Sequence, residues 1–186
     1  MPLPPPDCAR ESSHRRSITI SAYARSDGLW DIEGQLTDAW SEPVPRAGGM
    51  LPAGEPMHSM WLRLTVDRSA TVVAAQAVTD AGPYGEACGT VSPDYGKLVG
   101  VRVARGWREA IRRLFGRTAG CTHVNELAGV MGSATLQALW RELTAGADEK
   151  PFAIDGCHAL KASGPQVARF FPRWFRPDDS AAVGHD

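Results

Sequence analysis

The chain has 186 residues, of which 43% are hydrophobic and 22% are charged. This length and composition predict one globular domain with a sizeable core and leave little room for two full domains. The formal net charge is −1. A chain so close to neutral lacks the basic excess typical of proteins that bind nucleic acid or an anionic membrane surface.

The sequence shows no targeting signal, and this observation together with the cysteine usage predicts a cytoplasmic protein. No uninterrupted apolar run reaches the length needed to span a bilayer. The amino terminus, Met1-Pro-Leu-Pro-Pro-Pro-Asp, has neither the basic start nor the apolar run of a signal peptide. Four widely spaced cysteines in such a chain are expected to be thiols or ligands, because a reducing compartment disfavours structural disulfides.

The first half of the chain predicts an antiparallel meander of about four strands. Residues 1–13 are expected to form a disordered, proline-rich tail. Alternating apolar and polar residues then indicate strands at 16–23, 29–38, 58–67 and 72–79, and Ser26-Asp27-Gly28 marks a hairpin turn. Residues 41–56 hold four prolines and three glycines and are predicted to be a long loop. In the third strand His58 falls on the same face as Met60 and Leu62, so its ring is expected to face the core.

The second half predicts two helices and an apolar end. Gly106-Trp107 opens a helix that runs to Phe115, and its arginines are expected to face water. Thr122 is the expected cap of a second helix that continues to about Leu143. Its expected apolar face consists of Val124, Leu127, Ala128, Met131, Thr135 and Ala138. The apolar segment 165–177 is expected to close the core as a strap, and residues 178–186 to be disordered. The predicted class is therefore α+β, with the sheet packed against two helices in a single domain over residues 14–177.

Cysteine and histidine side chains gather at a few places in this pattern. Cys121 and His123 stand at the start of the second helix, where the positive end of the helix dipole favours a thiolate or an anion. Cys88 lies in a predicted loop, and Cys157 and His158 form an adjacent pair. Three buried cysteines alone would be ordinary core residues. Their pairing with histidines is what favours a site.

The predicted site is a metal centre. Thiolate and imidazole ligands suit zinc or ferrous iron better than magnesium or calcium, and zinc is the preferred ion here. The expected ligands are Cys88, Cys121, His123 and Cys157. The expected catalytic groups are His58, Glu126 and His158. Glu126 follows His123 by three residues and is placed to orient it or to accept a proton, although an ordinary exposed helix glutamate explains it equally well.

Several motifs resemble an uncharacterised bacterial family of the DUF2889 type. They are His14-Arg-Arg16, Arg25-x-Asp-Gly-x-Trp-Asp-Ile-Glu-Gly34, His58-x-Met-Trp, Ala77-x-Thr-Asp80 with Pro83 and Cys88, Leu98-x-Gly100, Gly120-Cys-Thr-His-x-x-Glu-Leu127 and Cys157-His-Ala. The resemblance covers roughly residues 14–175. It implies that the six cysteines and histidines of the predicted site match motif positions, and it implies no activity.

The sequence therefore favours a small metal-dependent enzyme, of a hydrolase or lyase type, that acts on an organic small molecule. The ion would serve as a Lewis acid or would activate water. Two alternatives stay open. Four saturating ligands would make the site a non-catalytic structural or binding module. A thiolate at the start of the second helix would instead make Cys121 the nucleophile of a cysteine enzyme, with His58 or His158 as its base.

Overall fold

The computed structural model describes residues 3–144 and 149–178. The described residues divide into two compact units, with the division between Trp140 and Arg141. The elements of the first unit, in chain order, are β1 (His14–Ala24), β2 (Trp30–Trp40), β3 (Val44–Arg46), β4 (Gly49–Leu51), β5 (Pro56–Val66), β6 (Val72–Ala81), α1 (Glu86–Gly89), the 3-10 helix η1 (Ser92–Leu98), α2 (Trp107–Phe115), the 3-10 helix η2 (Arg117–Ala119) and α3 (Thr122–Ala138). Helix α4 (Trp140–Thr144) follows at the boundary.

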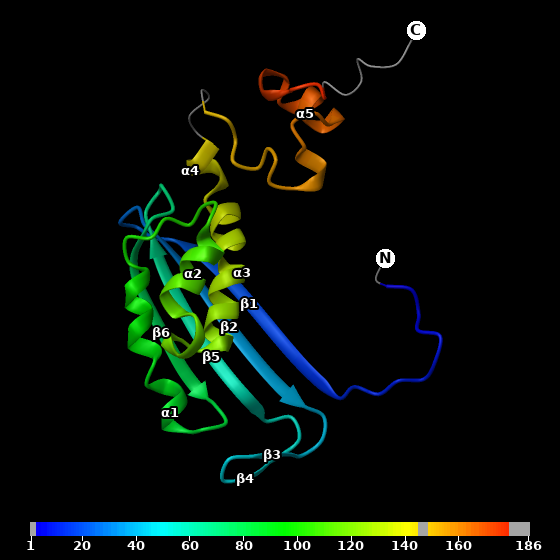
Figure 1. Cartoon of the computed structure of the whole chain (residues 1–186), viewed down its shortest axis with the longest axis vertical. Helices are drawn as coiled ribbons and strands as arrows, with labels where there is room; N and C mark the ends of the chain where they lie inside the picture. The colour runs from blue at the N-terminus through cyan, green and yellow to red at the C-terminus, as the bar shows by residue number, and fades with distance from the viewer. Residues whose placement is uncertain (1–2, 145–148, 179–186) are drawn as a thin grey trace. The chain divides into compact units, whose positions relative to one another are not determined.

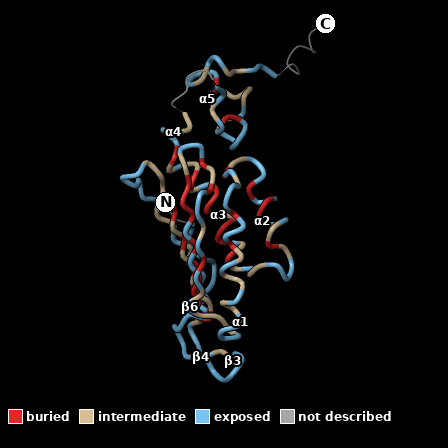
Figure 2. Tube along the Cα trace, turned by 90° about the vertical axis from the view of Figure 1, so that its left-hand side faces the viewer, coloured by how far each residue is buried: buried red, intermediate tan, exposed pale blue. Residues whose placement is uncertain are grey.

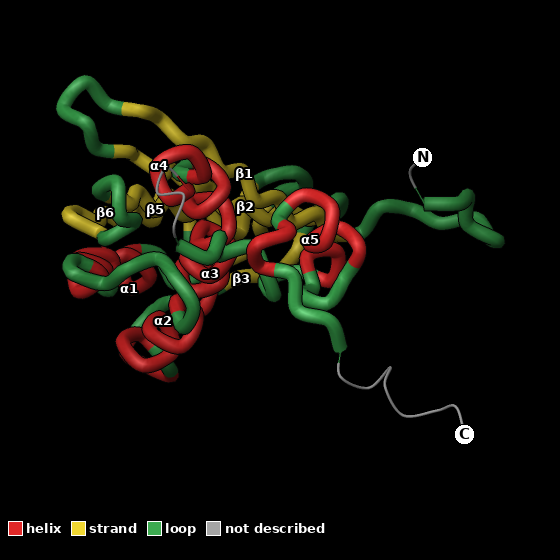
Figure 3. Tube along the Cα trace, turned by 90° about the horizontal axis from the view of Figure 1, so that it is seen from above, coloured by secondary structure: helices red, strands yellow, loops and turns green. Residues whose placement is uncertain are grey.

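The core of the first unit lies between a four-stranded antiparallel sheet and its helices. The strand order is β1-β2-β5-β6, so each long strand pairs with the next long strand along the chain. Helices α1, α2 and α3 lie on one side of these strands (Figures 1 and 3). The predicted α+β meander is thus confirmed. The prediction of a loop over residues 41–56 is only partly correct, because β3 and β4 form a short hairpin within this segment.

The period of two along β5 decides which residues enter the core. Met60, Leu62 and Leu64 are at most 1% exposed, and His58 shares their face with a side chain that is 13% exposed. The opposite face of the sheet is more polar and carries pairs such as Glu33 with Arg63. The helix-covered face is therefore the buried one. Figure 2 marks the buried residues along the chain in red.

Helix α3 packs closely on the sheet because β2 offers it a glycine. A Cβ atom at Gly34 would lie 2.7 Å from the Met131 sulfur and 2.9 Å from a Leu127 methyl group, so only glycine allows this approach. The predicted apolar face of α3 is confirmed in five of its six residues: Val124, Leu127, Ala128, Met131 and Thr135 are buried, and Ala138 is partly buried. Helix α2 joins this layer through the Trp107 indole, which donates a hydrogen bond to the carbonyl of Ala128 over 2.7 Å.

Both ends of α3 differ from the prediction. Its N-cap residue is Cys121, and no side chain caps it. Thr122 is therefore the first helical residue and not the cap. The helix ends at Ala138, where Leu139 leaves the helical conformation at φ −88° and ψ 16°. The predicted single helix to Leu143 is thus divided into α3 and α4.

The second unit contains short elements only: the 3-10 helix η3 (His158–Leu160), α5 (Pro165–Phe170) and the 3-10 helix η4 (Pro172–Trp174). Asp155 organises the turn before η3, since its carboxylate accepts bonds from the Lys150 ammonium and the Ala162 amide. The predicted strap is short helical turns in which Val167 is buried and Phe170 is 59% exposed. Whether it closes the core stays a prediction.

The predicted disordered tails lie only partly within the described residues. Residues 3–13 are exposed and contain no helix or strand, while residues 1–2 and 179–186 lie outside the description. The single domain predicted for residues 14–177 also stays a prediction. None of the helices in residues 3–144 and 149–178 has the length and apolar character needed to cross a membrane.

Candidate functional site

The candidate site lies where three neighbouring strands meet at one end of the sheet. In the register of the sheet, Arg16 of β1 is opposite Asp38 of β2, and Asp38 is in turn opposite His58 of β5. Side chains of cross-strand partners lie on the same face. All three therefore point to the side that α3 covers, at the point where the register between β2 and β5 shifts after Asp38.

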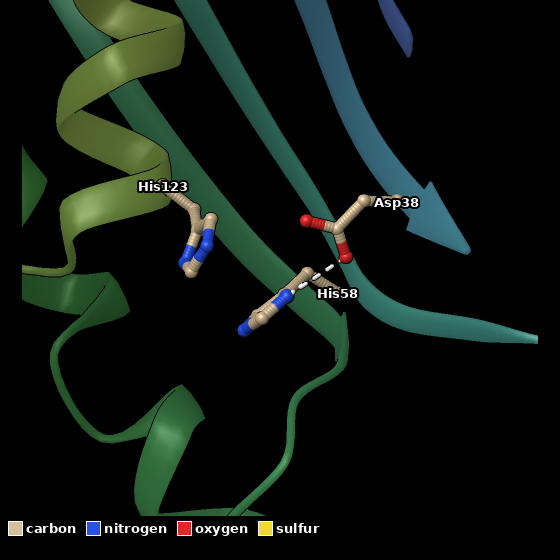
Figure 4. A group of neighbouring side chains, drawn as sticks. All are labelled: Asp38, His58 and His123. Atoms are coloured by element: carbon tan, nitrogen blue, oxygen red, sulfur yellow. Dashed lines mark hydrogen bonds and ion pairs between the residues drawn. The ribbon is translucent and has the colours of Figure 1, made fainter. Parts of the chain in front are cut away.

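Asp38 is the buried centre of this group, with a side chain that is 1% exposed. Its Oδ2 atom accepts hydrogen bonds from Nη2 and Nε of Arg16 at 2.6 and 3.2 Å. Its Oδ1 atom lies 2.9 Å from Nδ1 of His58 (Figure 4). Burial raises the pKa of Asp38, but the bonds from Arg16 and His58 outweigh this effect and hold the pKa below its ordinary value. The carboxylate is therefore ionised at neutral pH.

Helix α3 adds His123 to the group. Its ring stacks on the ring of His58, with 3.7 Å between centroids and 29° between planes (Figure 4). Burial lowers the pKa of His123, and the charges of His58 and Arg16 lower it further. Neutral imidazole is the form that binds metals. Among the described residues, Asp38, His58 and His123 form a group whose ligand atoms all lie within 4.8 Å of one another.

The start of α3 is held in place by a hydrogen-bond network around Tyr95, which is 0% exposed. The Tyr95 hydroxyl accepts a bond from the Cys121 amide at 3.0 Å and lies 2.8 Å from Oδ1 of Asn125, to which it donates. The Asn125 side chain donates in turn to the carbonyl of Phe115. A Cβ atom at Gly120 would lie 2.6 Å from Cβ of Phe115, so glycine is required there. The network thereby fixes the backbone two residues before His123.

Arg16 forms a second ion pair, with Glu126, beside the Asp38, His58 and His123 group. Arg16 donates from Nη1 to Glu126 over 2.7 Å while its other nitrogens bind Asp38, so one guanidinium joins two carboxylates. His14 packs against Trp40 with 4.3 Å between ring centroids, and its Nε2 atom is 3.9 Å from Oδ2 of Asp38. Glu126 also lines a groove of about 290 Å³ together with Arg108 and Asn125.

The predicted residues are distributed between this group and other places. His58 and His123 belong to it. Cys121 is adjacent, with Sγ 4.0 Å from Nδ1 of His123. Cys88 lies in the one-turn helix α1 instead of the predicted loop, beside Gly82, and it does not join the group of ligand atoms found within the described residues.

The remaining two predicted residues, Cys157 and His158, belong to the second unit, where both are exposed. The convergence of Cys88, Cys121, His123 and Cys157 on one ion stays a prediction. The same holds for the catalytic roles expected of His58, Glu126 and His158. Each of these roles requires a bound ion or substrate to test it.

Sequence reasoning did not select Asp38, Arg16 or His14 as site residues. A signal was present, because Asp38 is in phase with Ile32 and Leu36 along β2, both of which are 0% exposed. A charged residue in phase with buried apolar residues is expensive to bury unless it is paired. Arg16 is likewise in phase with Ile18 on β1. The period of two could therefore have identified both.

The donor set of the group fits a divalent transition metal. One carboxylate and two imidazoles are the ligand types found in open zinc and non-haem iron sites. The distance of 2.9 Å between Asp38 and His58 suits either a hydrogen bond or two neighbouring ligand atoms of one ion. The ionised Asp38 and the neutral His123 are the protonation states that metal binding requires.

The fold and the site define an α+β protein with a cluster of one buried aspartate and two partly buried histidines. The chain belongs to the family described as "Protein of unknown function (DUF2889)", which matches residues 14–137. This range contains the whole cluster but not Cys157 and His158. Searches found no matching curated protein and no matching solved structure.

Proposed function

We propose that this protein is a small metal-dependent enzyme that acts on an organic small molecule. The observation that carries the proposal is the group formed by the buried Asp38 and the partly buried His58 and His123, with ligand atoms all within 4.8 Å of one another. These three residues would hold the ion, zinc in preference to iron. The ion would supply Lewis acidity or activation of water. Hydrolase or lyase chemistry is the proposed reaction type.

The surrounding residues support a catalytic role. Arg16 fixes the orientation of the Asp38 carboxylate through two hydrogen bonds, as outer residues commonly do for metal ligands. Glu126 is 41% exposed and is available as a proton acceptor at the edge of the group. The groove beside Glu126 is near the lower end of the volumes that suit small ligands, and Glu126 lines it while the three proposed metal ligands do not. Three protein ligands leave at least one coordination position for water or substrate.

The proposed compartment is the cytoplasm. All four cysteines, Cys8, Cys88, Cys121 and Cys157, are free. Free thiols are the usual state in a reducing compartment. No nucleic-acid or membrane partner is proposed, because the net charge of −1 offers no basic surface excess.

Metal analysis of protein purified without a histidine tag tests the ligand set. Stoichiometric zinc or iron is expected, and Asp38→Asn, His58→Gln and His123→Gln should each lower metal content at least about tenfold. The matched controls are Cys88→Ser and Cys157→Ser, which should retain the metal. Full metal content in the Asp38 and histidine variants, with loss in the cysteine variants, would overturn this ligand set and support the thiolate set predicted from the sequence.

An open coordination position distinguishes an enzyme from a structural metal module. Cobalt-substituted protein should change its visible absorption when azide is added, because azide enters a free position on the ion. A spectrum that azide does not change would indicate a saturated site and a non-catalytic role. Chelation should also lower the melting temperature, and an equal melting temperature in verifiably metal-free protein would argue against any bound ion.

One observation favours a second candidate function, that of a cysteine-nucleophile enzyme. Cys121 is the N-cap residue of α3, and its sulfur lies 4.0 Å from Nδ1 of His123. A helix amino terminus and a nearby imidazole both favour the thiolate. His58 carries a hydrogen-bonded carboxylate partner in Asp38, as an oriented base would.

A further inference from the structure

The two edges of the four-stranded sheet differ in how they are protected. At the β6 edge, the Val72 amide donates to the carbonyl of Val101, and the Gly100 amide donates to the carbonyl of Val72. Helix α1 and η1 also pack against β6. At the other edge, no segment of residues 3–144 and 149–178 pairs with the outer side of β1. The β6 edge is therefore paired at its first residue and partly covered by helices, whereas the β1 edge is open along its whole length among these residues.

Strand β1 has few of the features that usually prevent an open edge from pairing. It is 11 residues long, contains neither proline nor glycine, and keeps an unbroken register with β2. Natural edge strands are commonly short, bulged or interrupted by proline and charge. The charged residues of β1 are confined to its first three positions, and Arg16 is turned inward to Asp38. The rest of the strand is available for pairing.

The hydrogen-bond pattern shows which residues face the open edge. The Ser41 amide bonds the carbonyl of Ser13, and the Arg25 amide bonds the carbonyl of Leu29. Odd-numbered residues therefore direct their backbone groups toward β2, and in an antiparallel ladder the alternate residues face the other way. The even-numbered residues from His14 to Ala24 thus present their amides and carbonyls at the open edge.

We propose that β1 pairs with β1 of a second copy of this chain, antiparallel and centred on Thr19, to form one continuous eight-stranded sheet. This register places residue 14 opposite residue 24 and so uses the whole strand. It also keeps the helix-covered face of both copies on the same side, which a shift of one residue would reverse. The contact is isologous, as a twofold dimer requires.

On the open face of the sheet, the side chains of β1 complement their own copy. Thr19 meets Thr19 of the second copy at the twofold axis, and Ser17 meets Ser21. Arg15 meets Tyr23, which is 51% exposed in the single chain. Threonine and serine pairs favour cross-strand contact, and an arginine over a tyrosine ring adds a cation–π interaction.

On the helix-covered face, the pairing covers apolar surface and spares the candidate site. Ile18 meets Ile20 of the second copy, and each is only partly buried in the single chain. Arg16 meets Ala22, whose small side chain leaves the arginine bonded to Asp38. The proposal uses no metal, so its outcome is independent of the proposed function.

Sedimentation velocity of the full chain over a wide range of concentrations tests the proposal. A dimer is expected. Thr19→Lys and Thr19→Glu should each raise the dissociation constant at least about tenfold, because like charges then meet at the axis. An equal mixture of the two should restore a dimer. The matched control is Gln35→Lys, which adds the same charge beside Thr19 on the central strand β2 and should leave the dimer unchanged.

Cross-linking tests the register. Opposed residues of a non-hydrogen-bonded antiparallel pair are about 4.5 Å apart at Cα, within the range of a disulfide. Thr19→Cys should therefore form a disulfide-linked dimer, while Ser17→Cys, which meets Ser21, should not. A chain that is monomeric at every concentration overturns the proposal. So does a dimer that Thr19→Lys leaves intact, or one in which both cysteine variants cross-link equally.

Discussion

The Tyr95 hydroxyl should stabilise the fold and position the start of α3. Removing it in Tyr95→Phe keeps the ring, which stacks on Phe115 with 4.5 Å between centroids. The change leaves the Cys121 amide and Oδ1 of Asn125 without their hydroxyl partner. A polar group left unpaired away from water costs about 1–3 kcal/mol. Because both groups are only partly buried, a loss of about 2 kcal/mol is expected.

Urea denaturation at neutral pH measures this loss, with an unchanged m-value as the sign of an unchanged denatured state. The matched control is Tyr84→Phe, whose ring is 71% exposed and whose loss should stay within about 0.5 kcal/mol. A double-mutant cycle with Asn125→Ala should give a coupling energy of about 0.5–3 kcal/mol, because the two side chains share a hydrogen bond.

The same substitution should weaken the candidate site. His123 follows the fixed Cys121 by two residues, so a looser helix start should lower metal content in Tyr95→Phe but not in Tyr84→Phe. A Tyr95→Phe protein that matches the wild type in stability within about 0.5 kcal/mol would refute the reasoning. An additive double-mutant cycle would do the same.

Two further predictions concern single residues. Cys121→Ser should lose metal and stability if the sulfur is a ligand, whereas a nucleophilic Cys121 should leave stability unchanged. A fluorescent alkylating reagent checks the choice, because a ligated thiol is protected until the metal is removed and an activated thiolate reacts quickly near neutral pH. Asp67→Ala should cost about 1–2 kcal/mol at pH 7, because the carboxylate accepts bonds from Ser69 and from the Thr71 amide. Burial raises the pKa of Asp67, but these bonds hold it below its ordinary value. The stability lost in Asp67→Ala should therefore be full at pH values above the pKa of Asp67 in the unfolded chain. The loss should shrink as pH falls through the pKa of Asp67 in the folded protein. An equal loss in urea denaturation at pH 7 and at about pH 3 would contradict this expectation.

Much of the fold followed from local patterns. Alternation along 16–23 and 58–67 predicted β1 and β5 within a few residues of their ends, because a half-buried strand requires a period of two. It also placed His58 on the buried face. Helical spacing predicted the buried face of α3. The short hairpin β3–β4 was missed because proline and glycine dominate that segment.

The candidate site followed from the sequence only in part. The sequence analysis chose His58, Cys121 and His123 because cysteine and histidine are infrequent residues that can bind metals. The structure places these three residues near one another. The same reasoning passed over Asp38 and Arg16, because aspartate and arginine are common and usually solvated. Asp38 and Arg16 lie on the same strand faces as buried or partly buried apolar residues, and this alternation would have distinguished them from ordinary surface charges.

The sequence by itself indicated most of the element types, the buried faces of β5 and α3, and the cysteines and histidines of the predicted site, since these depend on residue type and on neighbours within one strand or helix. Only the tertiary structure decided that Arg16, Asp38 and His58 stand side by side on three strands. It also placed His123 of α3 over His58. Strand register and helix docking are relations between distant segments. The docking of α3 depends on its close approach to Gly34 and on the Tyr95 network. No local pattern contains that information.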